Sequence, residues 1–187
     1  MKKELILALR FTLVTTVVFG LLYPLGMTGL SQLLFPKQAA GSLIEKNGRI
    51  IGSKLIGQYF SSDKYFHSRP SAAGTGYDAS ASSPSNLAPT NQALVDRVKS
   101  DVAKLQQENP GAPIPADLVT SSGSGLDPEI SPASADFQIP RIAKARGLSA
   151  DTIKALVARH TQARTFGIFG EPRVNVLELN LDLDSLK

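Results

Sequence analysis

No charged side chain occurs between residues 11 and 36, which read FTLVTTVVFGLLYPLGMTGLSQLLFP. As an α-helix this segment would extend roughly 39 Å at about 1.5 Å per residue, whereas the hydrocarbon core of a bilayer is about 30 Å thick. The segment is therefore long enough to span even if Pro24 kinks it, and its Leu, Val and Phe side chains favour insertion. The sequence predicts a short N-terminal segment over residues 1–10, one transmembrane helix over 11–36 and a separate domain over 37–187.

The charges beside this span predict its orientation. Lys2, Lys3 and Arg10 precede it, whereas Lys37 is the only cation just behind it. Because basic residues stay on the cytoplasmic side, we expect a cytoplasmic N-terminus and a domain on the outer face. For a bacterial cell, this describes a single-pass protein of the inner membrane with its domain outside.

A cleaved signal peptide is the alternative interpretation of the same segment. Its apolar region would normally span about 7–15 residues and end at an A-x-A-like site. Here the apolar run is far longer, and the first small pair, Ala39-Ala40, has Lys37 or Gln38 three positions before the cut. The pattern favours a retained anchor in contact with membrane lipid.

Four small residues recur at every fourth position of the predicted helix, whose start lies before the span: Ala8, Thr12, Thr16 and Gly20. Such a stripe lets a second helix approach closely, although small residues are also common in transmembrane helices by chance. No ionisable residue lies within residues 11–36, so this helix builds no ion path or proton relay by itself. If transport is involved, partner subunits carry it.

Composition argues against several kinds of chemistry. The chain has 20 Lys+Arg and 16 Asp+Glu, and residues 37–187 are close to neutral, with no basic run interleaved with aromatics. We therefore expect no nucleic-acid partner. The absence of cysteine removes disulfides, zinc–thiolate sites and cysteine nucleophiles. The two histidines, His67 and His160, have no second ligand at suitable spacing, so no metal site is expected.

Catalytic motifs are similarly weak. The chain has no G-x-S-x-G elbow and no S-x-x-K pattern, although a Ser/His/Asp triad can occur in any order along a sequence. Ser121-Ser-Gly-Ser-Gly125 resembles a phosphate-binding nest in composition but lacks the Gly-Lys-Ser/Thr of a P-loop, so a structured turn is the better interpretation. Asp127 and Glu129 are expected to make local turn bonds, or else to draw cations. An outward-facing, membrane-anchored enzyme acting on envelope material remains the alternative to a non-catalytic subunit.

The domain is predicted to be α+β. Short β-branched runs between Gly48 and Gly57 indicate strands, and the Gly/Ser/Pro-rich stretch 68–90 is a long loop that is either functional or disordered. Residues 91–109 form a helix with one apolar stripe, capped by Thr90 or Asn91 and ended by Pro110-Gly111. The stripe consists of Leu94, Val95, Val98, Val102 and Leu105, which is typical of an ordinary surface helix.

Two further helices and a strand complete this prediction. Ser131-Pro132 caps a helix that runs to Arg146, is kinked at Pro140 and stops at Gly147. Ser149 caps the next helix, whose apolar residues are Ile153, Leu156 and Val157. At the C-terminus, apolar and polar residues alternate, which indicates a strand that pairs with the N-terminal strands. The apolar set is Leu177, Leu179, Leu181 and Leu183.

Many short motifs in one order resemble the KdpC family, the C subunits of the Kdp potassium-transporting P-type ATPases. They begin with Tyr23-Pro-Leu in the span and cover nearly the whole chain. The others are Phe35-Pro36, Gly41-Ser-Leu, Leu55-Ile-Gly-Gln58, Tyr65-Phe-His-Ser-Arg-Pro-Ser-Ala72, Ser85-Asn-Leu87, Asp117-Leu-Val-Thr120, Ser122-Gly-Ser-Gly-Leu-Asp127, Ile130-Ser-Pro132, Arg141-Ile-Ala-Lys-Ala-Arg146, Gly170-Glu-Pro-Arg-Val-Asn-Val176 and Glu178-Leu-Asn-Leu181.

The resemblance implies a membrane complex in which a potassium-channel-like subunit conducts the ion and a P-type ATPase subunit hydrolyses ATP. This chain has neither an Asp-Lys-Thr-Gly phosphorylation motif nor a Thr-Val-Gly-Tyr-Gly filter, which agrees with an accessory, non-catalytic role. The resemblance also implies a catalytic chaperone that raises the ATPase subunit's affinity for ATP, so ATP is a possible ligand although no cofactor of its own is expected. A domain outside the membrane would not meet cytoplasmic ATP directly.

A simpler physical hypothesis is that the domain caps the outer mouth of the channel subunit. Three loops, 66–72, 85–87 and 122–127, would make the contacts, and the small-residue stripe would dock the helix. Any effect on ATP turnover would then pass through the complex as a coupling free energy. The candidate contact residues are Ala8, Thr12, Thr16, Gly20, Phe66, Arg69, Pro70, Ser71, Ser85, Asn86, Ser122, Gly123, Ser124, Gly125 and Asp127.

Overall fold

The computed structural model describes residues 1–186, so Lys187, the last residue of the predicted domain, lies outside the described residues. The chain divides into two compact units, Met1–Ile51 and the part from Gly52 onward. Each is described by itself.

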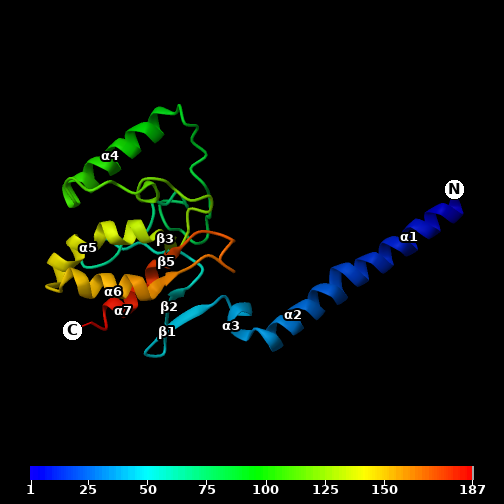
Figure 1. The fold of residues 1–187 in the computed structure, drawn as a ribbon. Helices are drawn as coiled ribbons and strands as arrows, with labels where there is room; N and C mark the ends of the chain where they lie inside the picture. The colour runs from blue at the N-terminus through cyan, green and yellow to red at the C-terminus, as the bar shows by residue number, and fades with distance from the viewer. Residues whose placement is uncertain (187) are drawn as a thin grey trace. The chain divides into compact units, whose positions relative to one another are not determined.

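The first unit begins with one helical segment, Lys2–Leu34, which is apolar enough to cross a membrane and has no buried residue. It consists of α1 (Lys2–Val17), a π-helical turn (Val18–Leu22) and α2 (Tyr23–Leu34) (Figure 1). The π turn ends at Leu22, two residues before Pro24, which has no N–H to donate to the Gly20 carbonyl. The proline expected to kink the helix is thus accommodated by a local change in hydrogen bonding.

A short helix and a β-hairpin follow the long helix. These are α3 (Pro36–Ala39), β1 (Leu43–Lys46) and β2 (Arg49–Ser53). Asn47 and Gly48 join the two strands with φ values of 54° and 73°, as a two-residue hairpin turn requires. The predicted strand region therefore holds only β2. Residues 54–57 are not in a strand, and β1 and β2 form a two-stranded sheet of their own.

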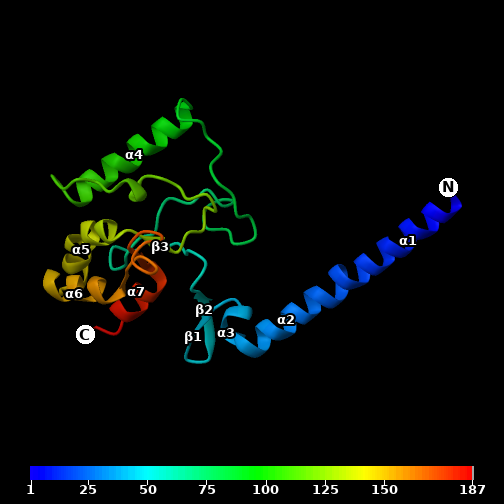
Figure 2. The same ribbon diagram turned by 45° about the vertical axis from the view of Figure 1, so that its right-hand side comes forward.

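The second unit contains no further helix or strand until α4 (Gln92–Glu108), so the predicted long loop is present. Asn91 is the N-cap of α4, because its side chain accepts a hydrogen bond from the Ala93 N–H. The predicted apolar stripe of α4 is only half-buried. Figures 1 and 2 show α4 as the outermost layer, with the chain from Pro110 onward running between it and the other helices. A short 3-10 turn, Ala116–Leu118, lies on that return path.

The remaining elements form the core of the unit. They are β3 (Glu129–Ile130), α5 (Pro132–Arg146), α6 (Ala150–His160), β4 (Thr161–Gln162), β5 (Arg173–Asn175) and α7 (Val176–Leu183). The predicted caps are confirmed, because Ser131 and Ser149 each accept a hydrogen bond from the N–H three residues on, and Gly147 ends α5 in the left-handed conformation. The strands form an antiparallel sheet in the order β3-β5-β4.

The predicted C-terminal strand is wrong beyond Asn175, because Val176–Leu183 is a helix. The Asn175 side chain accepts a hydrogen bond from the Glu178 N–H and so caps it. Its buried residues Val176, Leu179 and Leu183 are three and four apart, which places them on one helical face. The predicted sheet between N-terminal and C-terminal strands is likewise absent from the described residues, because β5 pairs with β3 and β4 instead.

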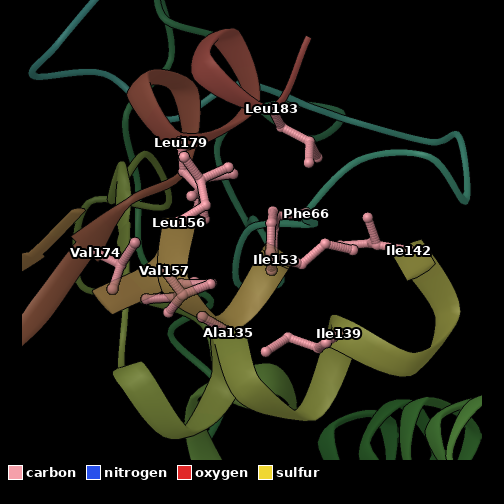
Figure 3. Close-up of a cluster of buried hydrophobic side chains, with 12 residues drawn as sticks. Phe66, Ala135, Ile139, Ile142, Ile153, Leu156, Val157, Val174, Leu179 and Leu183 are labelled. Carbon is pink, nitrogen blue, oxygen red and sulfur yellow. The ribbon is translucent and has the colours of Figure 1, made fainter. Parts of the chain in front are cut away.

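One hydrophobic cluster joins these elements (Figure 3). α5 packs against α6, and α6 packs against α7. Pro140 lies inside α5 and is exposed on its outer side. The cluster residues are Phe66, Ile130, Ala135, Ile139, Ile142, Ile153, Leu156, Val157, Val174, Val176, Leu179 and Leu183. The α+β class predicted for the domain is confirmed.

Candidate interaction site

Two of the motif-bearing loops meet in the second unit, and we call residues 65–83 together with 120–128 the loop cluster. The Ser71 hydroxyl donates to the Gly125 carbonyl at 2.5 Å, and the Arg69 guanidinium pairs with the Asp127 carboxylate at 2.9 Å. The Ser124 carbonyl accepts hydrogen bonds from the Ser83 N–H and the Ser82 hydroxyl, both at 3.0 Å. Segments about 50 residues apart in the sequence are thus fastened together.

Gly125 makes this close approach possible. It is buried and has a φ of +66°. A Cβ atom there would lie 2.6 Å from both the Ala73 amide nitrogen and the Ser83 carbonyl oxygen. Both neighbours are backbone atoms, which cannot rotate away, so only glycine fits between the two loops.

Side chains of α5 also hydrogen-bond to the backbone around residues 63–67, at the start of the loop cluster. Gln138 is 1% exposed, and its side chain accepts a hydrogen bond from the His67 N–H at 2.7 Å and donates to the His67 carbonyl at 3.1 Å. Arg141 donates to the carbonyls of Asp63 and Tyr65 and pairs with Glu108 of α4 at 2.7 Å. The loop is therefore ordered by side chains of α5 rather than by strand pairing.

The candidate contact residues differ in accessibility. Phe66 is fully buried, so its side chain belongs to the core rather than to the surface. Arg69, Pro70, Ser71, Ser122 and Asp127 are half-buried at the loop cluster, Gly123 and Ser124 are exposed, and Gly125 lies beneath them.

The third candidate loop lies next to this cluster. Ser85 and Asn86 follow Ser83, which is bonded to the other loops, and Asn86 is exposed with a φ of 53°. On the long helix, Ala8, Thr12, Thr16 and Gly20 are all exposed. Nearly all other residues of this helix are exposed as well, so exposure does not distinguish the stripe from the rest of the helix.

A cleft of about 620 Å³ lies between the loop cluster and α4. The rings of Tyr59 and Tyr77 are 6.0 Å apart on one wall, and Asp101, Lys104 and Glu108 line the other. Burial raises the pKa of Tyr77 to about 12, and its hydroxyl donates to the Arg69 carbonyl. Tyr77 therefore stays neutral and helps to hold the loop.

The charged side chains that line the cleft carry no net formal charge. They are the cations Arg69 and Lys104 and the carboxylates of Asp101 and Glu108. Arg69 also pairs with Asp127, so the lining offers no cluster of cations for a triphosphate. The glycine-rich residues 121–125 form a turn, as predicted, and do not open a helix that could receive a phosphate group.

Among the described residues, neither histidine ring is hydrogen-bonded to a serine hydroxyl, as a Ser/His/Asp triad would require. His67 Nε2 lies 3.1 Å from the Ser62 carbonyl oxygen, and burial, reinforced by the Arg141 guanidinium, lowers the pKa of His67. His160 Nε2 lies 2.8 Å from an Asp182 carboxylate oxygen, a pairing that the sequence spacing did not suggest. Among residues 1–186, no group of three or more His, Asp or Glu side chains is placed to hold a metal ion.

Asp117 is a further residue that sequence reasoning missed. Its carboxylate accepts hydrogen bonds from the Ser131 N–H at 2.8 Å, the Ser131 hydroxyl at 3.1 Å and the Ser134 hydroxyl at 2.5 Å. Burial alone would raise the pKa of Asp117, but these hydrogen bonds outweigh it and hold that pKa below its ordinary value. The Asp117-Leu-Val-Thr motif therefore fastens the start of α5. As predicted, Asp127 makes a local bond, from the Glu129 N–H at 3.0 Å, and Glu129 also pairs with Arg173.

These features define a class of protein: a membrane protein with one long apolar helix and one α+β domain whose polar loops are rigidly interlocked. The family described as K+-transporting ATPase, c chain (KdpC), matches residues 5–185. The potassium-transporting ATPase KdpC subunit of Koribacter versatilis is 60% identical over 184 residues, covering 98% of this chain and 95% of that protein. The chain belongs to the KdpC family.

Two other relatives are similar to this chain over nearly its whole length. The potassium-transporting ATPase KdpC subunit of Rhodopseudomonas palustris strain BisB18 is 56% identical over 199 residues, which cover the whole of both chains. That of Acidobacterium capsulatum is 58% identical over 180 residues, or 96% of each chain. The resemblance noted from the motifs is confirmed, and membership of a transporter-subunit family together with the apolar helix establishes a membrane protein.

Proposed function

We propose that this chain is a non-catalytic accessory subunit of an ATP-driven potassium uptake complex. The name of its relatives, potassium-transporting ATPase KdpC subunit, supports membership of such a complex. The partners that we propose within it are a potassium-channel-like subunit and a P-type ATPase subunit. The observation that carries the proposal is the loop cluster, in which two family motifs, residues 65–72 and 122–127, are joined by hydrogen bonds into one surface. The geometry of that surface suits recognition of a partner rather than conversion of a substrate.

The loop cluster is suited to docking because its loops already have a defined structure without a partner. Ser71, Arg69 and Ser83 are already bonded to the opposite loop, and Gly125 fixes the close approach. A surface that is ordered in advance loses little conformational entropy when a partner binds. We propose that it faces the outer mouth of the channel-like subunit, with the N-terminus of the chain in the cytoplasm.

The long helix supplies the second contact in this proposal. Its small residues permit close approach of a neighbouring helix, and the absence of charge within residues 11–36 leaves ion conduction to the partner. The stripe Ala8, Thr12, Thr16 and Gly20 is the face that we expect to dock.

The influence on ATP is proposed to be indirect. Docking that stabilises one conformation of the complex raises the ATPase subunit's affinity for ATP by the same coupling free energy with which ATP strengthens docking. This explains how an outer domain promotes ATP binding without contacting it. Photo-labelling of the complex with an ATP analogue separates the alternatives, since label on Tyr59 or Tyr77 would contradict the indirect route.

Site-specific photo-crosslinking in the assembled complex tests the capping role. A photo-crosslinking residue replaces Gly123, which has open space around it, and a matched control replaces Ala155 on the exposed face of α6. We expect the residue at position 123, but not at 155, to crosslink to the channel-like subunit. Crosslinks from 123 only to the ATPase subunit, or none at all in an assembled and active complex, would contradict the proposal.

A further inference from the structure

The loop between β4 and β5 carries an exposed apolar tip. All ten residues from 163 to 172 are exposed, and Phe166, Ile168 and Phe169 expose 87%, 72% and 65% of their surface. Figure 1 shows this loop, in orange, projecting from β5 away from α5 and α6. Three large apolar side chains within four residues are far more than isolated surface exposure explains.

Several backbone N–H and carbonyl groups of this tip hydrogen-bond to one another. Thr165 and Phe169 exchange N–H to carbonyl bonds at 2.8 and 2.9 Å, the Gly167 N–H donates to Arg164, and the Ile168 N–H donates to Thr165. Phe166 has a φ of 54°, an uncommon conformation for an aromatic residue. The loop therefore holds its apolar side chains outward while leaving few polar backbone groups to desolvate, which is what entry into an apolar phase requires.

The charge at the base of the tip is compatible with lipid headgroups. Arg164 pairs with Glu171 at 2.6 Å, so the loop from 163 to 172 carries no net charge. The exposed Arg159, at the end of α6, adds a cation just before the hairpin. Because the loop has no net charge, electrostatic repulsion does not oppose its approach to a membrane surface, and the adjacent cation is attracted to anionic lipids.

We propose that Phe166, Ile168 and Phe169 insert into the interfacial layer of the bilayer in which the chain's own helix is anchored. The bilayer is the one apolar phase that this chain necessarily has nearby, because only residues 35–51 join the helix to the second unit. Fully extended, those 17 residues reach about 60 Å at most. Tethering makes the insertion effectively intramolecular, so three side chains suffice where an untethered domain would bind weakly. The inference rests on the membrane anchor and not on the proposed capping role.

Fluorescence of the full chain in vesicles tests this insertion. Because the chain has no cysteine, Ile168→Cys gives a unique site for an environment-sensitive fluorophore, and Ala155→Cys on exposed α6 is the matched control. In vesicles of phosphatidylethanolamine and phosphatidylglycerol, we expect the label at 168 to shift its emission to the blue, to be quenched by lipids with brominated acyl chains and to be protected from aqueous iodide. The label at 155 should show the opposite quenching pattern.

A second variant separates insertion from a general effect of the label. Phe166→Asn with Phe169→Ser removes the apolar groups but keeps a residue that tolerates the left-handed conformation at 166. In that background the label at 168 should return to the values of the control, with an unchanged circular dichroism spectrum. The proposal is overturned if the label at 168 remains open to iodide in vesicles. It is also overturned if, in the purified potassium-transporting complex, the label is shielded from both iodide and brominated lipid, since a protein surface would then cover the tip.

Discussion

The side-chain amide of Asn180 pairs with both backbone polar groups of Phe66. It accepts a hydrogen bond from the Phe66 N–H at 2.8 Å and donates one to the Phe66 carbonyl at 2.9 Å. Asn180 is 2% exposed and Phe66 is fully buried. A residue of α7 therefore replaces the strand partner that this loop lacks, and the first loop of the cluster starts from a fixed point in the core.

Replacing Asn180 with Leu should strongly destabilise the domain. The N–H and carbonyl of Phe66 would both be left buried without partners, at a cost of about 2–4 kcal/mol in the free energy of unfolding. Urea unfolding of the full chain in detergent, followed by circular dichroism, measures this loss. Gln107→Leu, at an exposed position of α4, makes a similar change of side chain and should alter stability little. Equal stabilities of the two variants would show that the buried amide is not needed.

Two neighbouring glycines offer a matched test of the loop cluster. Gly125→Ala introduces a Cβ that overlaps the backbone of Ala73 and Ser83, at a residue with positive φ, and should destabilise the domain by about 2–4 kcal/mol. Gly123→Ala meets open space at an ordinary φ and should be tolerated. Thermal unfolding of both variants in detergent compares them. If Gly125→Ala unfolds with the wild-type midpoint, the two loops are not packed as described.

Asp117 should make stability depend on pH. Because its folded pKa is lowered, its contribution is fully present above the ordinary value of 3.8 and is lost as pH falls through the still lower folded pKa. Asp117→Asn should therefore cost about 1–3 kcal/mol at pH 7 through weaker bonds to Ser131 and Ser134, and the difference from wild type should shrink in acid. Urea unfolding from pH 7 to pH 3 measures this. The exposed Asp136→Asn is the control, and a difference from wild type that is constant over this range would refute the assignment.

The small-residue stripe predicts where assembly is sensitive to side-chain size. Thr16→Leu adds bulk to the face of Ala8, Thr12 and Gly20, and should weaken association with the partner helix by about 1–2 kcal/mol. This corresponds to a loss of roughly five- to thirty-fold in association. Val14→Leu, on the opposite face of the helix, should leave co-purification of the subunits unchanged. Equal loss with both variants would mean that the stripe does not mark the interface.

Local signals predicted the helices well. Asn91, Ser131 and Ser149 cap α4, α5 and α6 as expected, because a capping side chain acts within its own turn. At the C-terminus, alternation of Leu from 177 to 183 suggested a strand, yet Leu179 and Leu183 also lie four apart, so the same residues satisfy a helix. Asn175 followed by Glu178 was the capping signal that favours the helix.

The interaction site was predictable only in part. The motifs identified residues 66–72 and 122–127, but the bonds that join them link positions about 50 residues apart and leave no local pattern. Phe66 shows the difficulty most clearly, since its side chain lies in the core although its neighbours lie at the surface. The dipeptide Asn47-Gly48, in contrast, is a local signal for a hairpin turn, which the prediction of strands from Gly48 onward did not use.

The domain can cap the outer mouth of a channel-like subunit only if it lies on the outer side of the membrane. Protease added to sealed, right-side-out spheroplasts tests this, with permeabilised cells as the control for cleavage. We predict that the domain from Gly52 onward is degraded from the outside while the N-terminal residues remain protected. Full protection of the domain in sealed spheroplasts, with cleavage only after permeabilisation, would contradict the orientation and with it the capping role.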